Sequence, residues 1–131
     1  MIPSAHITVY NKYLVNRAEA YQRAQVFDCV WQSTKAVSRM REMTAANTAL
    51  ILIPFTSATE YVEPKAWQAT RVGWTLQEGD VIVRGLAEEE IADGFTITDL
   101  RNAHEFVVTI ASVDAMDQGS LAVRHFEVQA K

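Results

Sequence analysis

The residues Thr48-Ala49-Leu50-Ile51-Leu52-Ile53-Pro54-Phe55 form the most apolar stretch of the chain. A short apolar run of this kind, rich in isoleucine and leucine, is typical of a strand that is buried on both faces. Pro54 has no amide hydrogen to donate to a neighbouring strand, so we expect the strand to end there. The sequence therefore places the centre of the hydrophobic core in this segment.

Two segments before this stretch alternate with a period of two residues. His6 to Leu14 is the first, and Tyr21 to Gln32, which is rich in β-branched and aromatic residues, is the second. Such alternation predicts half-buried strands. In the second strand it places Phe27 on the same face as Cys29 and Trp31.

A further strand pattern, Val81 to Val83, follows the turn signal Glu78-Gly79-Asp80. This order of a turn and then a strand predicts a hairpin around the glycine. Within the strand, the alternation predicts that Val81 and Val83 point inward and that Arg84 points outward.

The end of the chain carries the clearest hairpin signal. Glu105 to Val113 and Leu121 to Val128 have strand patterns, and the polar segment from Asp114 to Ser120, which contains a glycine, joins them. Two such runs around a polar, glycine-containing link predict a β-hairpin.

Helical signals are few and short. Pro64 stands where the first turn of a helix would begin, so Glu63 to Ala69 is expected to be helical. Thr98 to Asn102 is expected to form another short helix, with Thr96 or Thr98 as its cap. Between the second strand and the apolar stretch, Thr34 to Ala46 is expected to be a long loop with helical turns.

These patterns predict an all-β protein, mainly an antiparallel β-barrel or sandwich of about six to seven strands with one or two short helical turns. A chain of 131 residues is long enough for one hydrophobic core, whereas two cores would each be marginal. We therefore expect a single domain over residues 1–131, with a long loop at about residues 33–47.

Composition narrows the class of protein. Hydrophobic residues make up 49% and charged residues 21% of the chain, an ordinary balance for a globular domain. No apolar run approaches the roughly 20 residues that a membrane-spanning helix needs, and the first residues lack the pattern of a secretory signal. We therefore expect a protein that is made in the cytoplasm and has no membrane partner. Cys29 is the only cysteine, which predicts a buried thiol and no internal disulfide.

The sequence offers no constellation for catalysis. No glycine-rich nucleotide-binding pattern is present, and the three histidines, His6, His104 and His125, are too far apart to suggest a metal site. Asp114 and Asp117 fit a hairpin turn better than a calcium-binding loop. We therefore expect a protein that is not an enzyme and has no catalytic residues, no cofactor and no metal ion.

Charge is distributed unevenly. The net charge of −4 argues against a protein whose main task is to hold nucleic acid through its phosphates. Basic residues outnumber acidic ones from Lys12 to Glu42, and acidic residues outnumber basic ones from Glu78 to Glu105. One interpretation is that these charges only solvate separate loops. The other is that basic and acidic surfaces of neighbouring copies meet head to tail, as in a ring.

Several stretches resemble a family of short proteins encoded among the late structural genes of tailed phages and prophages of Gram-positive bacteria, described as minor capsid or neck proteins. The resemblance covers nearly the whole chain. It is carried by Ile7-Thr8-Val9-Tyr10-Asn11-Lys12-Tyr13, Ile53-Pro54-Phe55, Pro64-Lys65-Ala66-Trp67, Trp74-Thr75-Leu76-Gln77-Glu78-Gly79-Asp80-Val81-Ile82-Val83-Arg84-Gly85, Ser112-Val113-Asp114, Gly119-Ser120 and Arg124-His125-Phe126-Glu127-Val128-Gln129-Ala130-Lys131.

The resemblance implies a structural role in the virion. Small β-barrel proteins of the phage neck form a ring below the portal, where they act as adaptors or head-closure (stopper) components that retain packaged DNA and receive the tail. The implied partners are the portal or adaptor, the tail-side neck proteins and further copies of the chain, on the order of six or twelve in a closed ring. A tail-completion or tail-terminator protein is a second possibility within the same structural class.

Two groups of residues are the candidate interaction sites under this hypothesis. Lys35, Arg39 and Arg41, in the predicted long loop, are expected to lie at an interface or to face the DNA channel, in non-specific contact with packaged DNA. Glu88, Glu89 and Glu90 are expected to form an acidic interface.

A ligand-binding function is the alternative from another class. Trp31, Trp67 and Trp74 are expected to pack in the core or at an interface. If instead they stack on bases or sugars, the chain is a small β-barrel that binds oligosaccharide or single-stranded nucleic acid.

Overall fold

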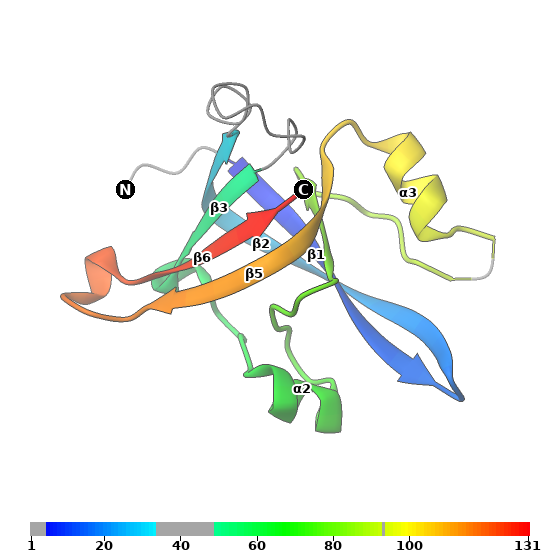
Figure 1. The fold of residues 1–131 in the computed structure, drawn as a ribbon, viewed down its shortest axis with the longest axis horizontal. Coiled ribbons are helices and arrows are strands. Elements are labelled where there is room, and N and C mark those ends of the chain that lie inside the picture. Colours follow the sequence, from blue (N-terminus) through cyan, green and yellow to red (C-terminus); the bar gives the residue numbers. More distant parts are fainter. Residues whose placement is uncertain (1–4, 34–48, 93) are drawn as a thin grey trace.

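A computed structural model of the chain describes residues 5–33, 49–92 and 94–131. Each of its six strands pairs antiparallel with its neighbours, and the order β1-β2-β3-β6-β5-β4 closes into a barrel (Figure 1). The predicted all-β class is thereby confirmed. The elements are β1 (Ala5–Val15), β2 (Ala18–Ser33), β3 (Ala49–Pro54), the 3-10 turn η1 (Phe55–Ser57), α2 (Pro64–Thr70), β4 (Val81–Arg84), α3 (Ile97–Ala103), β5 (Val107–Met116), the 3-10 turn η2 (Leu121–Val123) and β6 (His125–Ala130).

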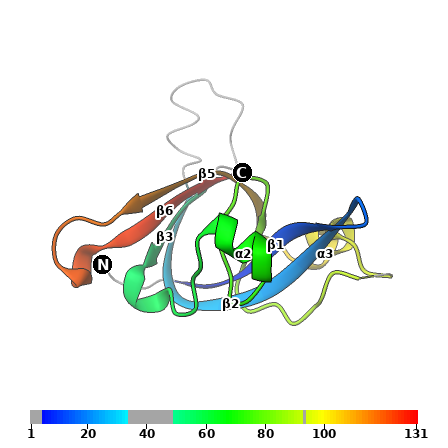
Figure 2. The ribbon, with the colours of Figure 1, turned by 90° about the horizontal axis from the view of Figure 1, so that it is seen from below.

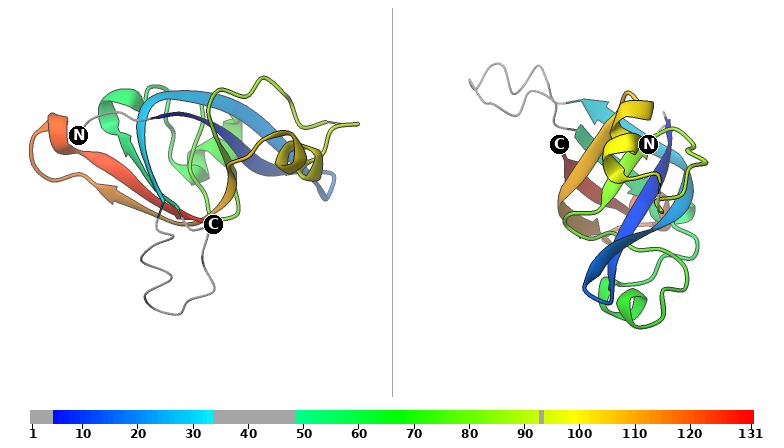
Figure 3. Two further views of the ribbon diagram at one scale, coloured as in Figure 1. Left: turned by 90° about the horizontal axis from the view of Figure 1, so that it is seen from above. Right: turned by 90° about the vertical axis from the view of Figure 1, so that its right-hand side faces the viewer.

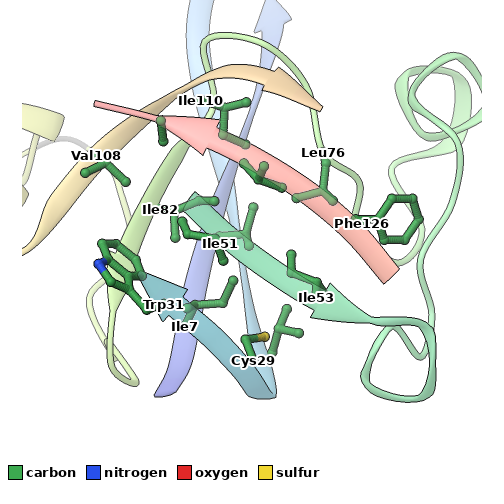
Figure 4. Close-up of a cluster of buried hydrophobic side chains, with 14 of the residues drawn as sticks. Ile7, Cys29, Trp31, Ile51, Ile53, Leu76, Ile82, Val108, Ile110 and Phe126 are labelled. Atoms are coloured by element: carbon green, nitrogen blue, oxygen red, sulfur yellow. The ribbon is translucent and has the colours of Figure 1, made fainter. Parts of the chain in front are cut away.

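The barrel interior is the main hydrophobic core, and every strand contributes to it. Figure 4 shows its labelled members: Ile7, Cys29, Trp31, Ile51, Ile53, Leu76, Ile82, Val108, Ile110 and Phe126. A second, smaller cluster contains Leu100 of α3 together with Tyr10, Val81, Val83 and Ala87. Burial of these two clusters is the main term that stabilises the fold.

The apolar stretch is a strand of the barrel, as predicted, but only one of its faces is fully buried. Ala49, Ile51 and Ile53 are buried, whereas Leu50 and Leu52 keep partial exposure. The prediction of a strand buried on both faces was wrong, because neither α2 nor α3, the two α-helices of the described residues, covers this part of the barrel wall. The strand ends at Pro54, as predicted.

A β-bulge changes the face assignments in β2. Ala5 pairs with Cys29 and Ile7 pairs with Val26, so one residue of β1 opposes two residues of β2. At the bulge, Asp28 has a φ of 60°, a conformation that aspartate tolerates better than most residues. Val26 therefore joins Cys29 in the core, and Phe27, predicted to be there, is exposed.

The strand β4 is buried along most of its length. Ile82 points into the barrel, while Val81 and Val83 point into the second cluster, which reverses the predicted faces. Arg84 is exposed, as predicted. Within the described residues, β4 pairs only with β1 and β5. The prediction of a hairpin around Gly79 was wrong, because the residues directly before this turn do not form a strand.

The predicted short helices and the terminal hairpin are confirmed. Pro64 is the first residue of α2. Thr96 caps α3 in a capping box, in which its hydroxyl accepts a hydrogen bond from the Asp99 amide and the Asp99 carboxylate accepts one from the Thr96 amide. The strands β5 and β6 pair over Ile110 to Met116. The loop predicted at about residues 33–47, including its helical turns, falls almost entirely outside the described residues.

The β1–β2 hairpin reaches far beyond the barrel. The strand β1 pairs with β4 only over Ile7 to Tyr10, so its second half stands out from the barrel together with the first half of β2 (Figure 1). The hairpin turn is Asn16-Arg17, and both residues have positive φ, 51° and 69°, which is the type I′ geometry preferred in two-residue hairpins.

Candidate functional site

The acidic segment Glu88 to Glu90 is held against the outer face of the β1–β2 hairpin. The Glu90 carboxylate accepts a hydrogen bond from Arg23 Nε at 2.8 Å. His104 Nε2 lies 3.0 and 3.1 Å from the two carboxylate oxygens of Glu89. The bond from His104 lowers the pKa of the Glu89 carboxyl. Glu88 is exposed, and no ion pair joins it to any of the described residues.

Backbone groups of the same segment are also fixed. Arg23 Nη1 and Gln25 Nε2 donate to the Ala87 carbonyl at 2.9 and 3.1 Å, and the Tyr10 hydroxyl donates to the Glu89 carbonyl at 2.7 Å. Burial, with the nearby Glu89 charge, raises the pKa of Tyr10 to about 12, so the phenol stays a donor at neutral pH. The acidic segment therefore presents a fixed surface.

Arg23 belongs to the basic segment from Lys12 to Glu42, and within one copy it bonds the acidic segment through Glu90 and the Ala87 carbonyl. Replacing Arg23 by alanine removes its bonds to Ala87 and Glu90, so we expect faster hydrogen exchange at the Ala87 amide, which donates to Thr8 Oγ1, and a stability loss of about 1 kcal/mol. Exchange measured by mass spectrometry checks this. The control is Arg124→Ala, because Arg124 donates to Gly119 in the terminal hairpin and its loss should leave residues 85–92 unchanged.

The other candidate group is not placed. Lys35, Arg39 and Arg41 lie outside the described residues. Their role at an interface or a DNA channel stays a prediction.

Two hairpins form projections that sequence reasoning missed as sites. The turn of the β1–β2 hairpin and the turn of the β5–β6 hairpin lie at opposite ends of the longest axis, as Figure 2 and the left view of Figure 3 also show. The first turn exposes 66% of Leu14 and 47% of Val15, and the second exposes 56% of Leu121 and 54% of Val123. Exposed apolar side chains gathered on projections are typical of protein–protein contacts.

The chemically reactive side chains are placed as structural groups. Cys29 is buried, as predicted, and burial raises the pKa of its thiol to about 12, so it is protonated at neutral pH. Among residues 5–33, 49–92 and 94–131, no three or more His, Cys, Asp or Glu side chains are grouped so that they could hold a metal ion.

All three tryptophans are buried, as predicted for packing residues. Trp67 is fully buried, and Trp31 and Trp74 are nearly so. Trp67 Nε1 donates to the Gly73 carbonyl and Trp74 Nε1 donates to the Thr59 carbonyl. In this structure none of them offers an open ring face for stacking on a base or sugar.

Two further findings concern membrane-spanning helices and similarity to known proteins. Of the helices in the described part of the chain, none has the length and apolar character of a membrane span. No curated protein and no solved structure matches the chain. One family model matches residues 2–131, nearly the whole sequence. The chain therefore belongs to this family, described as a family of unknown function (DUF6751).

Proposed function

We propose that this protein is a structural component of a tailed-phage or prophage particle, a neck adaptor or head-closure ring at the junction of head and tail. The role is non-enzymatic: the ring retains packaged DNA and joins the tail. It is assembled in the bacterial host cytoplasm and resides in the virion. Its partners are the portal or adaptor, the tail-side neck proteins and further copies of itself.

One observation carries the proposal: a closed barrel bears two apolar hairpin turns at opposite ends of its long axis. A closed barrel has no free sheet edge around its wall, so lateral contacts fall to the projections and loops. Contacts between different surfaces of identical copies are heterologous, and such contacts generate a ring when the rotation closes. The family resemblance described above supports the same assembly.

The test is the mass of the purified chain in solution, measured by light scattering after gel filtration, alone and with the neighbouring portal and neck proteins. We expect a ring that forms alone or when these partners are added. A hexamer that binds only the tail tube would favour a tail-completion or terminator protein instead. A monomer that ignores all of these partners would contradict the proposal.

A further inference from the structure

A cleft of about 450 Å³ opens beside the β5–β6 hairpin. One wall comes from the end of β5 and the start of β6, and the other comes from the segments before α2 and before Gly79. The lining residues include Tyr61, Glu63, Glu78 and Phe126. Such a volume accommodates two or three side chains of a partner.

The floor of the cleft is aromatic and tightly packed. The rings of Tyr61 and Phe126 lie 4.5 Å apart, and each contacts a further ring: Trp74 meets Tyr61 edge-on at 5.3 Å, and Phe55 lies 4.9 Å from Phe126. The Trp74 indole is fixed by its bond to the Thr59 carbonyl at 2.7 Å. A preorganised apolar floor of this kind favours an apolar partner group, because little ordering remains to be done on binding.

The rim of the cleft is negative. Glu63 and Glu78 are both exposed, and neither forms an ion pair with any of the described residues. Burial, with the nearby Glu63 carboxylate, raises the pKa of Tyr61, so the floor stays neutral. An apolar floor under two unpaired carboxylates fits a partner that presents apolar side chains next to a cation.

The turn of the β1–β2 hairpin has this chemistry. Leu14 and Val15 are adjacent in a strand, so they point to opposite faces of the hairpin and can contact two walls at once. Arg17, in the turn itself, forms no ion pair with any described residue. In the same copy Leu14 lies with Gln77 and Glu78 around a neighbouring pocket, but no residue of the β1–β2 hairpin lines the cleft itself. The turn of that hairpin lies at the far end of the long axis from the arrowhead of β5, so the cleft stays open within one copy (Figure 1).

The other projecting hairpin is excluded by its charge. Asp114, near the end of β5, and Asp117, in the turn, are both exposed and form no ion pair with the described residues, whereas the nearby Arg124 guanidinium is held by its bond to the Gly119 carbonyl. Placing these carboxylates against Glu63 and Glu78 would bring like charges together, which opposes binding. The charge of the rim thus selects one of the two apolar turns.

We propose that the cleft of one copy binds the β1–β2 turn of the next copy. Leu14 and Val15 cover the Tyr61 and Phe126 floor, and Arg17 pairs with Glu63 and Glu78. The two surfaces differ, so the contact is heterologous and repeats around a ring. This inference rests on the proposed ring function and names the partner of the cleft as a second copy of the chain.

Charge reversal tests the contact under the conditions in which the wild-type chain assembles. We expect Arg17→Glu to weaken self-association by about tenfold or more, and Glu63→Lys with Glu78→Lys to do the same. The variant that combines all three changes should regain assembly. Asp117→Lys, a reversal in the other hairpin turn, is the matched control and should assemble like the wild type.

A second variant removes the charge of Arg17 without disturbing the fold of the turn. Arg17→Gly creates the Asn-Gly pair that type I′ turns prefer, so it should keep or raise the stability of the hairpin while removing the charge. We expect it to fold and yet to assemble more weakly. If Arg17→Gly and Arg17→Glu assemble like the wild type, the inference is overturned while the ring function stands. A wild-type chain that never assembles, with or without its neck partners, overturns both.

Discussion

Replacing Asp80 by alanine is expected to lower the free energy of unfolding by about 3 kcal/mol, because several buried donors lose their acceptor at once. For a chain of this size the midpoint of thermal unfolding should fall by roughly 10 °C. Chemical unfolding followed by circular dichroism measures the loss. Glu88→Ala is the control: this exposed carboxylate has no ion pair to the described residues, so its removal should change stability by less than about 0.5 kcal/mol.

The reason for the large effect is the position of the carboxylate. Asp80 is fully buried where the β1–β2 hairpin leaves the barrel. It accepts hydrogen bonds from the Lys12 amide at 2.9 Å and from Asn11 Nδ2 at 2.7 Å, and from both the amide and the side chain of Gln77 at 3.1 Å. Asn11 in turn bonds the Thr75 backbone in both directions. The network fixes the segment before β4 to the base of the hairpin.

The loss of stability caused by Asp80→Ala should depend on pH, in a direction set by the pKa of Asp80. Burial raises the pKa of Asp80 above its ordinary value of 3.8, although its hydrogen bonds act in the opposite direction. An acid whose pKa is higher in the folded state stabilises that state most below the ordinary value, and this contribution declines as the pH rises through the raised pKa. The difference in stability between wild type and Asp80→Ala should therefore shrink as the pH rises above the ordinary value of 3.8 and through the raised pKa. A difference that grew with pH would contradict this assignment.

Local sequence signals were sufficient for much of the fold. Proline at the start of α2, threonine before α3 and the polar link of the terminal hairpin each act within a few residues, and all three predictions held. The bulge at Asp28 could not be read in this way. Strict alternation assumes an unbroken register, and the break depends on how β2 pairs with β1, more than 20 residues away along the chain. For this reason Phe27 was assigned to the wrong face.

The candidate site was only partly predictable. The run of three glutamates identified the acidic segment, but nothing local indicated that Arg23, 67 residues before Glu90, would pair with it. The β1–β2 turn was detectable in principle, since asparagine favours the left-handed conformation that a type I′ turn requires. It lacks the usual glycine after the asparagine, so the local sequence carries no strong hairpin signal at this turn. The cleft is assembled from four separate segments, so no sequence pattern reveals it.

Replacing Trp67 by alanine is expected to cost about 3 to 5 kcal/mol, the range for removing a buried aromatic side chain. Trp67 is fully buried, its indole donates to the Gly73 carbonyl at 3.1 Å, and its ring meets Tyr13 of the hairpin edge-on at 5.9 Å. Thermal unfolding measures the cost. Trp67→Phe is the control: it keeps most of the apolar volume and loses the indole bond, so a loss of about 1 kcal/mol is expected.

Trp67→Ala should also show whether self-association can be weakened while the barrel stays folded. In Figure 3 the helix α2 lies beside the projecting hairpin; the Trp67 ring contacts Tyr13, and Gln68 Nε2 donates to the Lys12 carbonyl at 3.0 Å. Arg71, just after α2, adds a further contact by lying over the Tyr13 ring at 4.9 Å. If α2 sets the direction of the hairpin, Trp67→Ala should weaken self-association even at temperatures where the barrel remains folded. Normal assembly by a folded Trp67→Ala chain would show that the contact between Trp67 and Tyr13 does not set the direction of the hairpin.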